Sequence, residues 1–168
     1  MPELVLVFDT VSLGNFLLAD AADLLVRRYR GRMRATSQVL DELIAGSRTR
    51  PALRAVDSLV AKRAMAQVDL GVREHGQYAA LIAGLGRGEA SCIAVARSRR
   101  WTVVTDDRAA RAHCEQLKLA YTGTIGILRA ACLDRQLQPA DADRMLALMV
   151  AAGYYSPVSR ISLLLPQA

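Results

Sequence analysis

The chain has 168 residues, of which 52% are hydrophobic, and it carries a formal net charge of +6. This length suits one domain with a hydrophobic core, and no apolar run reaches the roughly 18 residues of a membrane span. Three cysteines without metal-ligand spacing argue against a zinc site and a disulfide framework. We expect one cytoplasmic domain over residues 1–168, with residues 153–168 as a C-terminal tail and no membrane contact. The basic excess favours an anionic partner such as nucleic acid.

Strand and helix patterns alternate along the chain. A continuous apolar run at residues 4–8 is typical of a central strand that is buried on both faces. Further strands are predicted at residues 33–36, 66–70, 101–105 and 119–121. Helices are predicted at residues 12–30, 38–45, 51–63, 74–85, 109–117 and 125–133. This alternation predicts a three-layer α/β/α fold with a central parallel sheet.

Single residues mark several helix ends. Ser37 is predicted to cap the helix at residues 38–45, and Asp141 to cap a last helix that runs to Ala152. Between them, a glycine turn precedes a helix that carries Glu89 in its first turn and ends at Arg100. The last helix has an apolar stripe, which either packs in the core or forms dimer contacts: Met145, Leu148, Met149 and Ala152.

Acidic residues stand at strand ends and helix starts. Asp9 directly follows the first strand, and Asp106 and Asp107 follow the strand at residues 101–105. Glu89 opens one helix, and Glu42 shares the buried face of another. The carboxyl edge of a parallel sheet is where ligands bind in open α/β folds. Asp9 could equally serve as the cap of the helix behind it.

A cluster of these acids would have a definite chemistry. Like charges raise one another's pKa values unless a cation neutralises them, and oxygen-only ligands favour Mg²⁺ or Mn²⁺. Competing chemistries lack their motifs. The glycines at residues 84–88 follow a helix rather than a strand, no P-loop motif occurs, and the two histidines have no supporting acid pattern.

Basic charge comes almost wholly from arginine and concentrates near predicted helix ends. Such residues complement the helix dipole as solvated side chains, or they contact phosphates. The candidates for RNA binding are Arg27, Arg28, Arg30, Arg32, Arg97, Arg99, Arg100 and Arg108.

An ordered set of motifs resembles the PIN-domain nucleases, including ribonuclease toxins of the VapC kind, and within them a subgroup with a GEA helix and a paired-Asp strand end. The matching stretches are VFDTVSLGNFLL, SQVLDEL, GRGEASCIAVA, VVTDDRAAR, YTGTIGIL and GYYSP. They cover most of the chain in the right order. The resemblance implies a PIN-like fold with a metal-dependent acidic site at the sheet edge.

The resemblance also assigns residues to that site. The catalytic acids fall on Asp9, Glu42, Glu89 and Asp107. Asp9, Glu89 and Asp107 would hold the metal, with Asp106 as an alternative ligand one residue away. Thr10 or Ser12 would supply a supporting hydroxyl.

The number of residues after the strand distinguishes the predicted roles of the neighbouring acids Asp106 and Asp107. In the family the fourth acid falls two residues after a strand threonine, which here is Thr105 and gives Asp107. Asp106 is then expected to cap the helix that begins at Arg108.

Two functions follow as expectations. The first is a Mg²⁺- or Mn²⁺-dependent endoribonuclease, a hydrolase that acts as the toxin of a toxin–antitoxin pair, forms a homodimer and is held by an antitoxin protein. The second is a PIN-like domain that binds RNA or a protein with little or no catalysis.

Overall fold

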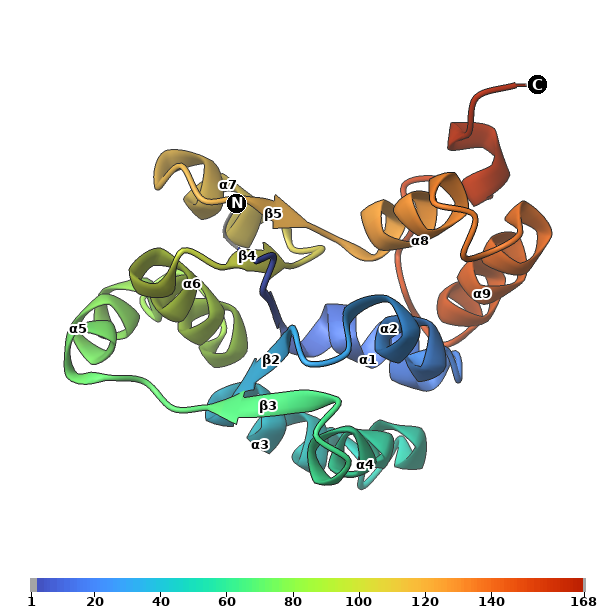
Figure 1. Ribbon diagram of the computed structural model, residues 1–168. Coiled ribbons are helices and arrows are strands. Elements are labelled where there is room, and N and C mark those ends of the chain that lie inside the picture. The colour runs from blue at the N-terminus through green and yellow to red at the C-terminus, as the bar shows by residue number, and fades with distance from the viewer. Residues whose placement is uncertain (1–2, 168) are drawn as a thin grey trace.

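A computed structural model describes residues 3–167 and shows a parallel sheet between layers of helices (Figure 1). The strands are β1 (Leu6–Phe8), β2 (Met33–Thr36), β3 (Met65–Val68), β4 (Thr102–Val104) and β5 (Tyr121–Thr122). Their order is β3-β2-β1-β4-β5, and each neighbouring pair is parallel. The predicted three-layer α/β/α fold is confirmed, and β1 occupies the centre of the sheet.

Helices fill both outer layers. They are α1 (Thr10–Leu18), α2 (Ala22–Tyr29), α3 (Ser37–Gly46), α4 (Ala55–Ala61), α5 (Val72–Leu81), α6 (Arg87–Arg99), α7 (Arg108–Gln116), α8 (Thr124–Leu133) and α9 (Pro139–Ala151). Short 3-10 helices are η1 (Pro51–Arg54) and η2 (Ile161–Leu164). In Figure 1, α5 and α6 lie on one side of the sheet, and α1, α2, α8 and α9 lie on the other. No helix within residues 3–167 is long and apolar enough to cross a membrane.

The core forms where β1 meets α1 and α6. All of β1 is buried, as the apolar run predicts. Helix α6 is buried continuously from Ala90 to Ala96, and small side chains let it approach the sheet closely. The same approach brings the first turn of α6, with Glu89, to the carboxyl edge of the sheet.

Several predicted boundaries are wrong. The predicted helix at residues 12–30 divides into α1 and α2, because Asp20 adopts a left-handed conformation with φ of 53°. Thr36 rather than Ser37 caps α3, and its hydroxyl accepts from Val39 N at 3.2 Å. Asp141 lies within the first turn of α9, since Pro139 already begins that helix.

The end of the chain packs against α8 and α9. Ile161 is fully buried, and Ser162 N donates to the Asp143 carboxylate at 2.9 Å, so the predicted tail includes an ordered 3-10 turn. In the apolar stripe of α9, Met149 is fully buried whereas Leu148 is 54% exposed. The predicted domain begins at residue 1 and ends at residue 168, and both residues lie outside the part of the chain that the structure describes.

Candidate active site

Asp9 is the most deeply buried acid at the carboxyl edge, with only 1% of its surface exposed. Its Oδ1 accepts a hydrogen bond from Ser12 N at 2.8 Å and thereby caps α1. Its Oδ2 has no hydrogen-bond partner among the described residues. Burial raises the pKa of Asp9 to about 7, although the nearby Thr105 hydroxyl and the Ser12 backbone and hydroxyl oppose this effect, and the charge of Asp106 adds to it. Asp9 is therefore both a helix cap and a buried carboxylate with a free oxygen.

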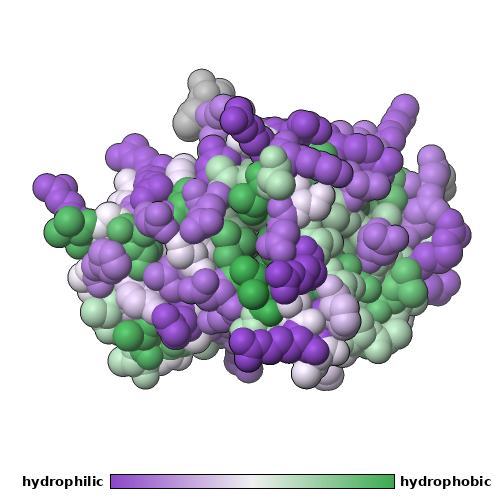
Figure 2. All heavy atoms as spheres, turned by 90° about the horizontal axis from the view of Figure 1, so that it is seen from below, coloured by the Kyte–Doolittle hydropathy of each residue, from purple (hydrophilic) through white to green (hydrophobic). Residues whose placement is uncertain are grey.

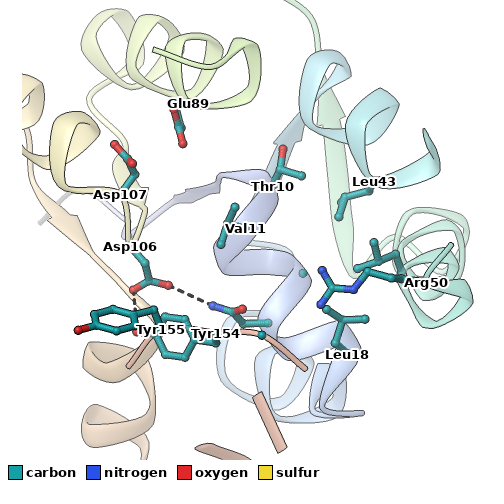
Figure 3. A pocket seen from close by; sticks show the side chains of 14 residues that line it. Thr10, Val11, Leu18, Leu43, Arg50, Glu89, Asp106, Asp107, Tyr154 and Tyr155 are labelled. Atoms are coloured by element: carbon teal, nitrogen blue, oxygen red, sulfur yellow. Dashed lines mark hydrogen bonds between the residues drawn. The ribbon is translucent and has the colours of Figure 1, made fainter. Parts of the chain in front are cut away.

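Glu89 and Asp107 bring two further carboxylates to the same edge. The Glu89 carboxylate accepts from Gly86 N at 3.0 Å, which closes the first turn of α6. Burial raises the pKa of Glu89, and the charges of Asp107 and Glu42 raise it further. In Figure 3 the Glu89 and Asp107 side chains come from different elements and lie near one another. The negative charges of Asp107 and Glu42 are thus close enough to Glu89 to act on its ionisation.

Glu42 is held by hydrogen bonds inside the protein. Its Oε2 accepts from the Thr10 hydroxyl at 2.5 Å, and its Oε1 accepts from Gly88 N at 3.0 Å. A Cβ on Gly88 would lie 2.6 Å from Thr10 Oγ1 and 2.8 Å from Glu42 Oε2. Gly88 therefore allows α6 to approach α1 and α3. Its signal in the sequence is the second glycine of GRGEA, for which no role was predicted.

Asp106 is surrounded by donors. Its Oδ2 accepts from Ser12 Oγ at 3.1 Å, Asn15 Nδ2 at 3.3 Å and Thr124 Oγ1 at 2.5 Å. Its Oδ1 accepts from Thr124 N at 2.9 Å and Tyr154 Oη at 3.5 Å. Asp106 thus ties α1, β4, α8 and the segment after α9 together. Asn15, Thr124 and Tyr154 were not predicted as site residues, although they lie within the stretches VFDTVSLGNFLL, YTGTIGIL and GYYSP.

Asp107, not Asp106, caps the helix that begins at Arg108, so the predicted cap is wrong by one residue. Its Oδ1 accepts from Ala110 N at 2.7 Å. Successive residues leaving a strand point in different directions. Asp106 turns toward the tyrosines after α9, and Asp107 turns toward Glu89 (Figure 3).

A cavity of about 440 Å³ opens at part of this edge, and neither Asp9 nor Glu42 lines it. Glu89, Asp106 and Asp107 line one part of it, and Thr10 lies among them. The remaining wall is largely apolar, and its residues are Val11, Gly14, Asn15, Leu18, Leu43, Arg50, Leu53, Gly153, Tyr154 and Tyr155. Ser12 is fully buried and does not line the cavity, so Thr10 is the hydroxyl that faces it.

Most of the predicted RNA-binding arginines lie away from the acids. Those near the end of α2 and the start of β2 are Arg27, Arg28, Arg30 and Arg32. Those at the end of α6, before β4, are Arg97, Arg99 and Arg100. Segments that precede parallel strands lie at the amino edge of the sheet, opposite the acids that follow β1 and β4. Only Arg108, at the start of α7, lies at the acidic edge.

Comparison with known proteins identifies the family. A family model described as a PIN domain matches residues 5–168. The chain belongs to the PIN-domain family. It is similar in fold to the crystal structure of PAE2754 from Pyrobaculum aerophilum, with a TM-score of 0.54 and 20% identity over 77% of this chain and 90% of that chain. No curated protein matches the chain. The predicted PIN-like fold is therefore confirmed, and it is a nuclease-type fold.

PIN domains typically use divalent metal ions, and the acids of this PIN domain fit such an ion in donor type. Asp9 offers a buried oxygen without a protein donor, and burial with neighbouring charges raises the pKa values of Asp9 and Glu89. A bound cation relieves both effects. Within residues 3–167, however, no three acidic, histidine or cysteine side chains are close enough together to hold one ion.

Proposed function

We propose that this PIN domain, over residues 1–168, is a Mg²⁺- or Mn²⁺-dependent endoribonuclease that hydrolyses RNA phosphodiester bonds. The observation that carries the proposal is the buried Asp9 carboxylate, whose Oδ2 has no donor among the described residues. A carboxylate in this environment is stabilised by a positive charge. Glu89 and Asp107 at the same sheet edge complete an oxygen-rich site.

The acids divide into two roles. Asp9, Glu89 and Asp107 would hold the ion, which when bound polarises a phosphoryl oxygen and activates water. Asp106 is the weaker candidate ligand, because protein donors already occupy both of its oxygens. Glu42 would fix the position of the Thr10 hydroxyl through their 2.5 Å hydrogen bond.

RNA is the proposed substrate because the chain carries a net charge of +6, and basic side chains contact the phosphates of a polyanion. The arginines of the amino edge would contact phosphates remote from the cleavage site, whereas Arg108 would contact phosphates close to it. Salt should therefore weaken RNA binding steeply.

The biological setting is also proposed. The motifs resemble those of VapC-like toxins, so we expect a cytoplasmic toxin that forms a homodimer and is inhibited by an antitoxin. Arrest of growth on expression of the chain alone, with relief by a small protein encoded next to it, would support this setting. A monomer by light scattering at high concentration would count against the dimer.

One observation favours a second candidate, a PIN-like domain that binds RNA or protein with little catalysis. No three acids among residues 3–167 are arranged to hold a common ion. The two candidates differ in their response to metal. Only the nuclease should convert a bound RNA to shorter products when Mn²⁺ is added.

The direct test is cleavage of labelled single-stranded RNA with Mn²⁺, with EDTA, and with a Glu89→Gln variant. If the protein is a nuclease, only the wild type with Mn²⁺ should cleave the RNA. End-mapping of the products then locates the cleavage site. Titration calorimetry should show weaker Mn²⁺ binding by Glu89→Gln. Equal Mn²⁺ affinity in both proteins, or cleavage that survives EDTA, would contradict the proposed metal site.

A further inference from the structure

A second cavity of about 610 Å³ adjoins the acidic one. The two share Asp106, Tyr154 and Tyr155, so a wall of two tyrosines and one acid separates them. The far side of the second cavity carries cations, because Arg108 and Arg111 line it together with Tyr121. A ligand that extends from the acids across this wall would meet aromatic rings first and positive charge next.

Tyr155 is the exposed part of the wall. It is 93% exposed, although a large aromatic side chain gains free energy by burial. The residue before it is fixed, since Tyr154 N donates to Met149 O at 3.0 Å and Tyr154 Oη donates to Asp106 Oδ1 at 3.5 Å. Figure 3 shows both tyrosines beside Asp106. The protein thus holds the backbone of Tyr155 in place and leaves its ring open to a ligand.

Several contacts also fix the position of the Arg111 side chain. Its Nε donates to Thr105 O at 3.0 Å, and its guanidinium lies 5.5 Å from the Tyr121 ring centroid. A Cβ on Gly123 would lie 2.2 Å from Arg111 Nη2, so the glycine makes space for the guanidinium. The Arg111 guanidinium also forms an ion pair with Asp106, with Nη2 3.6 Å from Oδ1, and its side chain is 38% exposed on the cavity side. Arg108, one turn earlier on α7, adds a second positive charge.

We infer that the second cavity binds the nucleotide next to the cleaved phosphate of a single-stranded RNA. Its base stacks on Tyr155, and its phosphate contacts Arg108 and Arg111. Paired bases are stacked inside a duplex and cannot reach the ring, whereas unpaired bases stack on aromatic side chains. The inference rests on the proposed function, because it takes the acidic cavity as the place of cleavage.

The test uses the full chain in EDTA, so that binding is measured without cleavage. The probe is a short single-stranded RNA that carries 2-aminopurine, whose fluorescence falls on stacking. Tyr155→Ala should weaken binding about tenfold and abolish the fluorescence change, whereas Tyr155→Phe should retain both. Arg108→Ala should lower the salt dependence of binding by about one phosphate contact.

Two controls make the result specific. Val72 is 92% exposed on α5, and Val72→Ala should leave RNA binding unchanged. A duplex RNA of the same sequence should bind wild type and Tyr155→Ala equally. Wild-type affinity and fluorescence change in Tyr155→Ala, or an equal loss on duplex RNA, would overturn the inference.

The inference and the proposed function fail in different ways. Fluorescence loss on binding without cleavage in Mn²⁺ would support the subsite and contradict the nuclease. Cleavage that is unaffected by Tyr155→Ala, with no fluorescence change in the wild type, would support the nuclease and overturn the subsite. A segment of a protein partner in this cavity would instead show as a loss of partner binding in Tyr155→Ala with RNA binding intact, which also overturns the inference.

Discussion

The two edges of the central sheet differ in charge. At the carboxyl edge, acids follow β1 and β4, and burial or neighbouring charges raise the pKa values of Asp9 and Glu89. At the amino edge, helices end and strands begin with basic residues. Among the described residues, four of the five non-glycine positions with positive φ are basic: Arg63, Arg100, Lys118 and Arg135.

This difference separates the acids from a group of basic side chains. Arg27, Arg28, Arg97 and Arg99 stand in the last turns of α2 and α6, at the other edge, where they complement the helix ends. Near the acids, the cavities are lined by Arg50, Arg108 and Arg111. A polyanion would therefore meet a locally acidic cleavage site and a separate basic surface.

The largest expected effect comes from the carboxyl edge. Asp107→Asn should lower cleavage by about 100-fold, since it removes one of the three carboxylates that would hold the ion. Stability should change little, because Asn also caps a helix well. Cleavage rate and melting temperature at saturating Mn²⁺ measure the two effects.

Asp106→Asn is the matched comparison for Asp107→Asn. The sequence predicts that Asp106→Asn keeps much of the activity, because Asn can replace Asp as a helix cap. The structure gives it a different role, since Asp106 accepts hydrogen bonds from Ser12, Asn15 and Thr124. Replacing an acceptor oxygen by an NH₂ group should lower the free energy of unfolding by roughly 1–3 kcal/mol. The melting temperature should fall by several degrees. An inactive, stable Asp106→Asn beside an active Asp107→Asn would reverse the assignment.

The next effect tests an ion pair that joins α5 to α6. Glu74 is 4% exposed, and its bonds to Arg99 lower its pKa from 4.5 to about 2. Because the folded pKa is depressed, the contribution to stability is complete above about pH 4.5 and is lost as the pH falls toward 2. Glu74→Gln should cost about 3 kcal/mol at pH 7.

Urea unfolding between pH 3 and 7 measures this contribution. The difference in the free energy of unfolding between wild type and Glu74→Gln should shrink as the pH falls through this range. A constant difference at all these pH values would show that the Glu74 charge does not carry the stability.

A smaller effect tests the close packing at the acidic edge. Gly88→Ala introduces a Cβ that would lie 2.6 Å from Thr10 Oγ1 and should cost about 1–3 kcal/mol. It should also reduce cleavage, because α6 carries Glu89. Gly76→Ala on α5 is the control, since nothing lies within 4 Å of its added Cβ. That change should stabilise the protein by roughly 0.5–1 kcal/mol. Similar melting temperatures for both variants would contradict the packing argument.

The smallest expected stability change tests the amino edge. Arg63→Gly, Arg100→Gly and Lys118→Gly remove charge at positions where glycine is conformationally favourable. The fold should keep its stability within about 0.5 kcal/mol, while the salt dependence of RNA binding should fall by about one phosphate contact for each residue. Arg135→Gly, with a φ of 57°, should behave in the same way, because Asp134 and Gln136 beside it bond Arg28 at the end of α2. Unchanged salt dependence would show that these residues only end their helices and do not contact RNA phosphates.

The sequence by itself predicted the features that depend on neighbouring residues. The apolar run at residues 4–8 predicted a central strand, and β1 is fully buried at the centre of the sheet. The strand at residues 33–36 was predicted with its observed bounds. The helical period placed Glu42 inward and left Asp41 exposed. Burial on both faces and helical spacing leave strong local patterns, so these inferences needed no tertiary information.

Tertiary structure alone decided the roles of the paired acids. Thr105, Asp106 and Asp107 are adjacent in the chain, and no local pattern distinguishes a cap from a buried acceptor at this strand end. Asp106 finds its donors in Ser12 and Tyr154, which lie 94 and 48 residues away along the chain. The same is true of the arginines, whose separation from the acids follows from the direction of the strands. Contacts across such distances depend on how the sheet orders its strands, which is why only the folded chain shows them.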